Sequence, residues 1–140
     1  MHLALYILLY IMHPNIEPGL EKAYEKTVAM WAPNVAYVSE VRWANGYDML
    51  QMGQLNAYFG MYQDRSIIVN PTLNNGQWDD FDLTITLAHE YGHALGMQHV
   101  EGYAIMYPLW NLPIPDKPTN LDWDELDRVK KLSLDTPLIK

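Results

Sequence analysis

Residues 89 to 99 read His89-Glu90-Tyr91-Gly92-His93-Ala94-Leu95-Gly96-Met97-Gln98-His99, which is the pattern H-E-x-x-H-x-x-G-x-x-H. Two histidines four residues apart on a helix project from the same face, so both imidazoles can reach one metal ion. Gly96 can adopt the positive φ that ends a helix abruptly, which lets the chain turn back and present His99. The pattern therefore predicts that His89, His93 and His99 are ligands of one zinc ion.

Three protein nitrogens leave the fourth tetrahedral position of zinc open, as in catalytic sites. Glu90 follows the first ligand, where a carboxylate can act as general base toward a metal-activated water and pass the proton to the leaving amine. The reaction that this chemistry implies is peptide-bond hydrolysis without a covalent enzyme intermediate. Coincidentally spaced core or surface histidines are the alternative, and the full eleven-residue pattern favours the metal site. His2 and His13 lack such a context, and we interpret both as structural or solvent-facing.

Composition narrows the class of protein. The 140 residues carry 9 Lys+Arg and 17 Asp+Glu, a formal net charge of -8, and 49% of them are hydrophobic. This length and apolar content predict one domain with its own core, and the acidic balance argues against nucleic acid as a partner. The chain has no cysteine. This absence excludes disulfides, thiolate nucleophiles and cysteine-based zinc sites.

The hydrophobic pattern predicts an α+β (mixed α/β) fold. Helices are expected at residues 17–31, 81–95 and 121–132, and strands at residues 3–12, 35–42, 48–52, 55–59 and 66–70. The helix over 81–95 carries the active-site motif. Residues 15–19 and Asn45-Gly46 are expected to form turns, and the strands over 48–52 and 55–59 are expected to pair as a hairpin.

Acidic residues suggest how two of the helices begin. Asp80 or Asp82 is the expected N-cap of the helix over 81–95, and Asp79 adds to the negative charge that suits a helix N-terminus. For this reason we interpret the three aspartates as capping groups rather than as a cation site. Asp122, with Glu125 three residues later, fits an acidic capping box for the last helix.

The N-terminal apolar run, Leu3 to Met12, is too short to span a bilayer as a helix. No Lys or Arg precedes it and no small-x-small cleavage site follows, so a buried strand is a better interpretation than a signal peptide. We therefore expect a soluble chain that does not associate with a membrane. It would be cytoplasmic or released by another route. The sequence leaves the compartment open.

Beyond the zinc motif, residues 104–108 read Ala104-Ile105-Met106-Tyr107-Pro108, with Met106 seven residues after His99. The long motif followed by a methionine turn resembles the metzincin clan of zinc endopeptidases, and I-M-Y-P resembles its matrixin (matrix metalloproteinase) branch. The resemblance implies a mostly parallel twisted sheet with three helices. It also implies a single catalytic domain over 1–140, with an upper subdomain over 1–96 and a lower one over 97–140.

The same resemblance suggests roles for residues around the zinc. Met106 would form an apolar floor beneath the site, and Tyr107 and Pro108 would form the wall of the pocket beside the scissile bond. Further substrate-binding residues would lie on an edge strand, where an extended peptide or protein substrate pairs with the backbone: Leu55, Asn56, Ala57 and Tyr58. We expect the protein to act as a monomer.

Departures from the family pattern limit the expected cofactors. Matrixins carry a structural zinc and calcium in a long loop before the edge strand, and here that loop would be only Gly53-Gln54. We therefore expect one catalytic zinc and no structural zinc, and we do not assume calcium. Val100 stands where many matrixins have serine.

Three other functions stay open. One is a zinc- or peptide-binding module without turnover, which would have no need of Glu90. Another is an archaemetzincin-like aminopeptidase, but that family adds a cysteine zinc site that this chain cannot build. A third is a peptidase that acts on cell-wall peptides.

Overall fold

Four α-helices and four short strands form the part of the chain that the structure, a computed structural model, describes: residues 14–55, 57, 59–74, 79–109 and 113–135. In chain order the elements are β1 (Asn15–Ile16), α2 (Glu21–Trp31), β2 (Glu40–Trp43), α3 (Gly46–Gln54), β3 (Gly60–Gln63), β4 (Ser66–Val69), a 3-10 turn (Pro71–Asn74), α4 (Asp80–Ala94) and α5 (Asn120–Asp135). The predicted α+β fold is confirmed, although we expected three helices.

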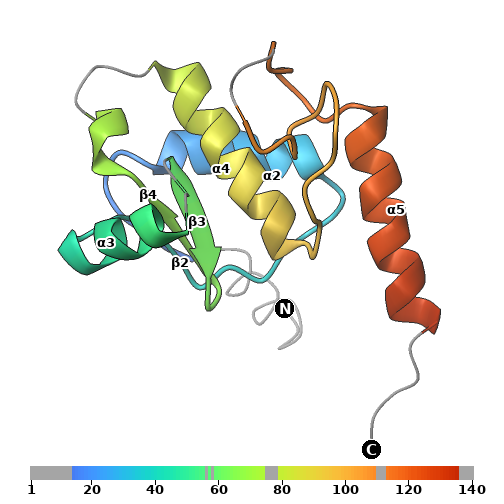
Figure 1. The fold of residues 1–140 in the computed structure, drawn as a ribbon, viewed down its shortest axis with the longest axis horizontal. Helices are drawn as coiled ribbons and strands as arrows, with labels where there is room; N and C mark the ends of the chain where they lie inside the picture. Colours follow the sequence, from blue (N-terminus) through green and yellow to red (C-terminus); the bar gives the residue numbers. More distant parts are fainter. Residues whose placement is uncertain (1–13, 56, 58, 75–78, 110–112, 136–140) are drawn as a thin grey trace, which may run out of the picture.

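The strands form one sheet in the order β1-β2-β4-β3. β1, β2 and β4 run parallel, with Val41 opposite Ile67, whereas β3 pairs antiparallel to β4, with Met61 opposite Ile68. The predicted, mostly parallel sheet is confirmed. Because β3 comes last in the order, it is an edge strand (Figure 1).

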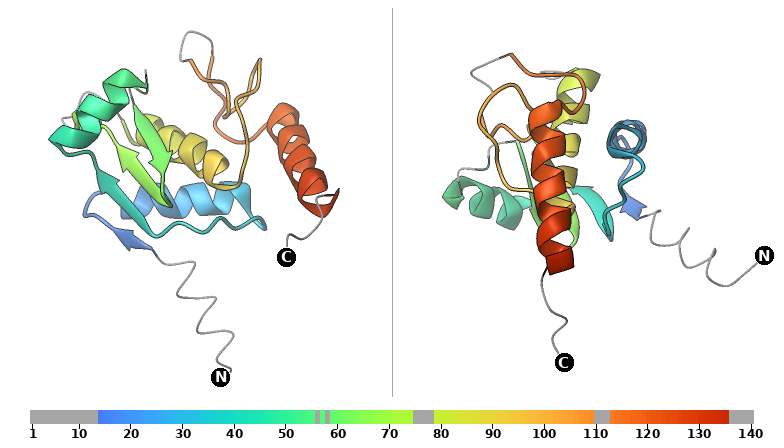
Figure 2. Two further views of the ribbon diagram at one scale, coloured as in Figure 1. Left: turned by 60° about the horizontal axis from the view of Figure 1, so that its bottom comes forward. Right: turned by 90° about the vertical axis from the view of Figure 1, so that its right-hand side faces the viewer.

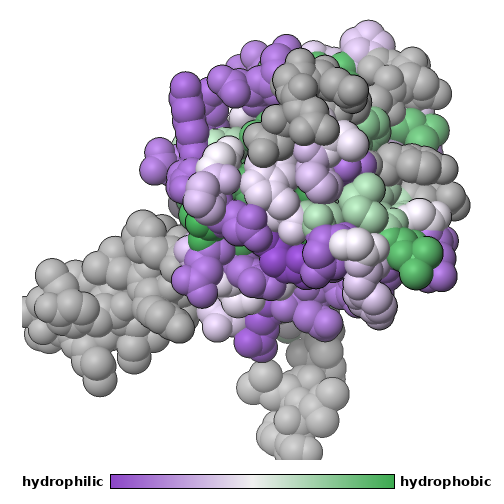
Figure 3. All heavy atoms as spheres, turned by 90° about the vertical axis from the view of Figure 1, so that its left-hand side faces the viewer, coloured by the Kyte–Doolittle hydropathy of each residue, from purple (hydrophilic) through white to green (hydrophobic). Residues whose placement is uncertain are grey.

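Different helices pack against the two faces of the sheet. Successive strand residues point to opposite faces, so Val41, Ile67 and Val69 join the main core with α2 and α4. Ile68 and Met61 point the other way and pack with Met52 of α3 in a second, smaller core. Figure 2 shows α2 and α4 side by side, with α3 on the far side of the strands. The face of the molecule near α3 is mostly hydrophilic, with apolar residues in separate small groups (Figure 3).

Helix α3 corrects the prediction of a hairpin over residues 48–52 and 55–59. Asn45 accepts a hydrogen bond from the backbone N–H of Asp48 at 2.9 Å, and the Asp48 carboxylate accepts one from the Asn45 N–H at 2.8 Å. This reciprocal capping box begins a helix where we expected a turn and a strand. Arg42 of β2 also binds both carboxylate oxygens of Asp48 and holds the pKa of this buried group below its usual value.

The other element boundaries agree with the predictions in part. α2, α4, α5 and β4 form within one to four residues of their expected ends, but β2 covers only the C-terminal part of the strand expected over 35–42. The turn expected over 15–19 was wrong at its start, because Asn15–Ile16 pairs with β2. The strand predicted over Leu3 to Met12 lies outside the described residues.

Two predicted helix caps were also wrong. Asp79, rather than Asp80 or Asp82, caps α4, because its carboxylate accepts the Asp82 N–H at 2.8 Å. In α5 the Asp122 carboxylate reaches back to the N–H of Thr119 at 2.9 Å. Asp122 is therefore the third residue of the helix and not its N-cap.

We expect Asp48→Asn to lower the free energy of unfolding by roughly 1–3 kcal/mol at neutral pH, because it removes the negative charge that faces Arg42 and replaces one of the two acceptor oxygens with an NH2 group. Urea denaturation measures this loss. The pKa of Asp48 is lower in the folded chain, so its contribution is complete above the ordinary aspartate pKa of about 4 and declines as the pH falls further. The difference between variant and parent should therefore narrow below about pH 4.

Glu40→Gln is the matched control, because Glu40 pairs with the same Arg42 but its side chain is 41% exposed. We expect it to cost less than about 1 kcal/mol. Equal losses for the two variants would contradict the role given to Asp48.

Candidate metal centre

Two buried hydrogen bonds hold helix α4, which carries His89, Glu90 and His93, against its neighbours. The indole N–H of Trp31 in α2 donates to the backbone carbonyl of Ala88 at 3.0 Å, and the Tyr91 hydroxyl accepts the backbone N–H of Ala36 at 2.9 Å. Trp31 and Tyr91 are almost fully buried. Contacts of this kind fix both the position and the rotation of α4, and with them the direction in which His89 and His93 project.

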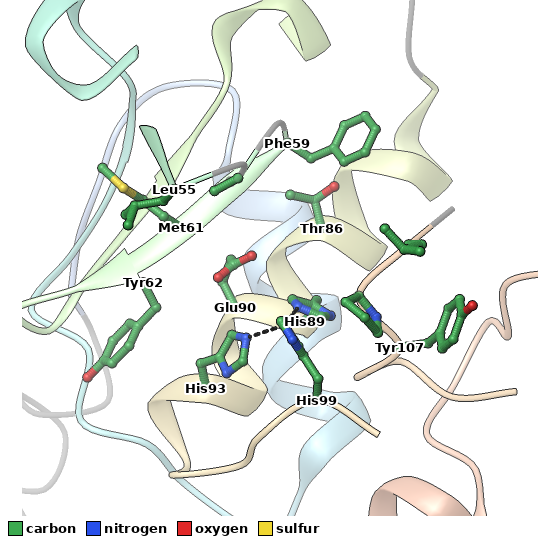
Figure 4. Close-up of a pocket in the computed structure, with 14 residues that line it drawn as sticks. Leu55, Phe59, Met61, Tyr62, Thr86, His89, Glu90, His93, His99 and Tyr107 are labelled. Carbon is green, nitrogen blue, oxygen red and sulfur yellow. Dashed lines mark hydrogen bonds between the residues drawn. The ribbon is translucent and has the colours of Figure 1, made fainter. Parts of the chain in front are cut away.

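His99 reaches the same point from beyond the helix. Gly96 has φ +96°, a conformation that glycine adopts without strain, and it directs the chain back toward α4. The Nε2 atom of His99 lies 3.3 Å from Nε2 of His89 and 3.2 Å from Nε2 of His93. The structure thus brings the three predicted ligands together, and their ligand atoms all lie within 4.8 Å of one another (Figure 4).

These distances fit a metal ion. Two nitrogens about 2.0–2.1 Å from one tetrahedrally coordinated zinc ion lie about 3.3–3.4 Å apart. The Nδ1 atoms of His89 and His93 face the backbone carbonyls of Ile105 at 2.8 Å and Met97 at 2.9 Å. An Nδ1–H that donates to these carbonyls leaves the Nε2 lone pair directed at the centre.

Burial keeps the imidazoles in the form that binds a metal. It lowers the pKa of His89 to about 3, and it also lowers the pKa values of His93 and His99. A metal ligand must be the neutral imidazole, so these shifts remove the competition from protons near neutral pH. The three residues form a ligand set of the kind that zinc prefers.

Glu90 lies in the cleft beside the histidines, with its carboxylate directed into the space between α4 and β3 (Figure 4). It is 7% exposed, and burial raises its pKa to about 8. A carboxyl group that exchanges a proton near neutral pH suits general acid and base chemistry. A Cβ on Gly60 would lie 3.1 Å from the Thr86 side chain and 3.5 Å from that of Glu90, so glycine allows β3 to approach α4 closely.

Met106 lies under α4 and is fully buried. A Cβ on Gly92 would lie 2.3 Å from the Met106 sulfur, so the close contact requires glycine at that position of the helix. The backbone around Met106 is fixed by Asp122 of α5, whose buried carboxylate accepts the N–H groups of Ile105 at 2.9 Å and Met106 at 3.0 Å. No local sequence pattern reveals this function of Asp122, because the bonds join residues 16 or 17 positions apart.

The cleft encloses about 390 Å³. Four of the residues expected to bind substrate line it: Leu55, Ala57, Tyr107 and Pro108. Asn56 and Tyr58 lie outside the described residues. The edge strand itself is β3 (Gly60–Gln63), which begins two residues after the end of the expected stretch 55–58. The cleft therefore has several further lining residues that were not predicted: Phe59, Gly60, Met61, Tyr62, Thr86 and Leu109.

Comparison with known proteins gives the family. No curated protein sequence matches the chain. In the residues that the structure describes, no helix combines the length and apolar character needed to cross a membrane. The family model described as Matrixin matches residues 26–133, a range that includes the zinc motif, the methionine turn and most of α5. The chain therefore belongs to the matrixin family of zinc-dependent metalloproteases.

Proposed function

We propose that this protein is a zinc endopeptidase that cleaves extended peptide or protein chains, with Glu90 as its general base. One observation carries the proposal. The Nε2 atom of His99 lies at tetrahedral spacing from those of His89 and His93, next to a buried carboxylate, in a cleft that borders an edge strand. Membership of the matrixin family supports the same reaction class.

His89, His93 and His99 would hold the ion. A bound Zn²⁺ supplies Lewis acidity, which polarises a carbonyl oxygen and lowers the pKa of a water molecule. Glu90 accepts a proton from the attacking water and returns it to the nitrogen of the leaving amine. Its position suits both steps, because the carboxyl group lies in the cleft beside the three histidines that would hold the ion.

Strand β3 is the proposed site of substrate pairing. Phe59 accepts the backbone N–H of Asn70 at 2.9 Å, and the register then makes Met61 and Gln63 the residues that bond to β4. Residues between hydrogen-bonded pairs of an antiparallel ladder direct their N–H and C=O groups to the opposite side. Gly60 and Tyr62 therefore offer these groups along the cleft, where an extended peptide can add to the sheet.

We expect a medium or large apolar residue directly after the cleaved bond, and the wall of the cleft opposite β3 supports this preference. Tyr107, Pro108 and Leu109 line it, and Leu109 is 55% exposed. Apolar surface in a cleft binds apolar side chains through the hydrophobic effect. A peptide-library digest read by mass spectrometry reports this preference.

Glu90→Gln should lower the rate of peptide cleavage by about 10²–10⁴-fold, because the amide cannot accept the proton, while zinc binding is retained. Cleavage of a quenched fluorescent peptide and metal analysis of the same sample give the two readouts. Glu101→Gln is the control, since Glu101 is exposed and does not line the cleft. A Glu90→Gln variant as active as the parent would show that another group is the base. A parent that binds zinc but cleaves no peptide in the library would favour the binding module.

Metal analysis after growth with zinc should find one zinc per chain, and chelation should abolish cleavage. We expect His99→Ala to weaken zinc binding by more than about 100-fold, because it removes a ligand rather than a supporting contact. His13→Ala, outside the motif, should leave the affinity unchanged. Purified protein without zinc would refute the assigned centre, and two zinc ions per chain would refute the expected stoichiometry.

A further inference from the structure

The third histidine has weaker local support than the other two. His89 and His93 are part of α4, and a backbone carbonyl lies next to the Nδ1 atom of each. His99 follows the helix on an irregular segment, is exposed, and has no hydrogen-bond partner for Nδ1 in the described part of the chain. The position of its imidazole therefore depends on how the backbone of residues 96–100 is held.

Hydrogen bonds to three different parts of the chain hold that backbone. The N–H of Met97 donates to Gly92 of α4 at 3.0 Å, and the N–H of Val100 donates to Met106 at 3.1 Å. Between them, the N–H of Gln98 donates to the Glu125 carboxylate of α5 at 2.8 Å. Gln98 directly precedes His99, so Glu125 holds the residue next to the third ligand.

Glu125 is itself oriented. Arg128 forms two bonds with it, from Nε to Oε1 at 2.7 Å and from a terminal nitrogen to Oε2 at 2.8 Å. A two-point fork of this kind fixes the plane of a carboxylate as well as its position. The Glu125 side chain is 9% exposed even though Arg128 is 44% exposed, so the acceptor of the Gln98 bond is largely shielded from water.

Helix α5 also touches the segment before Gln98. A Cβ on Gly96 would lie 3.0 Å from a methyl carbon of Val129, so α5 packs directly on the turn that redirects the chain. Figure 1 shows α5 beside the irregular segment that follows α4. The contacts of Val129 and Glu125 flank Met97, and they come from neighbouring turns of one helix.

We propose that Glu125, oriented by Arg128, is a positioning residue for the metal centre: through the Gln98 backbone it holds His99 where its imidazole meets those of His89 and His93. The inference rests on the proposed zinc function and adds a residue outside the H-E-x-x-H-x-x-G-x-x-H motif. In the described part of the chain, Glu125 forms hydrogen bonds with Gln98 and Arg128 and none with the three histidines. Its expected effect is on the affinity of the centre for zinc and on how much His99 contributes to that affinity.

Zinc affinity, measured by competition with a chromophoric chelator, tests the proposal. Glu125→Ala should weaken zinc binding by about 10–100-fold, the range found when groups that orient metal ligands are removed. Glu125→Gln keeps an oxygen for the Gln98 N–H but loses charge and part of the Arg128 fork, so its loss should be smaller. Asp124→Ala, an exposed acid on the same helix, should bind zinc as the parent does. Glu125→Gln also serves if Glu125→Ala does not fold.

A double-mutant cycle separates positioning from general stability. In a His99→Ala background, Glu125→Ala should produce no further loss of zinc affinity, because the ligand that it positions is gone. The melting temperature of the metal-free proteins gives the structural effect alone. Visible spectra of the cobalt-substituted proteins report the third ligand directly, and Glu125→Ala should shift the spectrum toward that of His99→Ala.

Three results would overturn the proposal. They are unchanged zinc affinity in Glu125→Ala, an equal loss in the presence and absence of His99, or a lower melting temperature with unchanged cobalt spectra. If the parent protein binds zinc and any of these occurs, the positioning role fails and the zinc function stands. If the parent protein binds no zinc, both fail.

Discussion

The rest of the structure depends on the meeting of three imidazoles, in which Nε2 of His99 lies 3.3 Å from that of His89 and 3.2 Å from that of His93. One helix can supply two of them, because residues four apart share a face, but it cannot supply the third. Gly96 ends α4 with a positive φ and makes His99 reach back. Since imidazoles lose water when they gather in this way, burial lowers their pKa values and keeps them ready for a cation.

Support for this centre comes from a helix far along the chain. The segment between α4 and α5 is irregular, so its backbone N–H groups lack the regular partners of a helix or sheet. Two carboxylates of α5 accept hydrogen bonds from it: Asp122 on the side of Met106, and Glu125 on the side of His99. The ring of Trp123 in the same helix packs edge-on against that of Trp31 in α2, with the ring centroids 5.5 Å apart. This contact joins α5 to the main core. The backbone around Met106 and the backbone beside His99 thus share one support.

The sequence predicted well where the signal is local. α4 and the three histidines follow from a spacing of four residues and a glycine, and β4 follows from a short apolar run that a proline ends. The stretch after β2 was predicted wrongly, because its short apolar run allows both structures: Leu50 and Met52 share a face of a strand, whereas Met49 and Met52 share a face of a helix. Asn45 and Asp48 decide for the helix, and Asp48 is held there by Arg42 of a neighbouring strand. The edge strand was consequently expected too early.

What the sequence by itself determined is the set of chemical groups: three histidines at a fixed spacing, the adjacent carboxylate of Glu90 and the absence of cysteine. What only the tertiary structure decided is which strand borders the cleft and what Asp122 and Glu125 do there. The physical reason is the separation along the sequence over which each interaction acts. Helix periodicity and a glycine turn depend on residues a few positions apart, so the sequence alone can predict them. The partner of a buried carboxylate or of a strand edge is chosen by packing between segments that only the folded protein brings together.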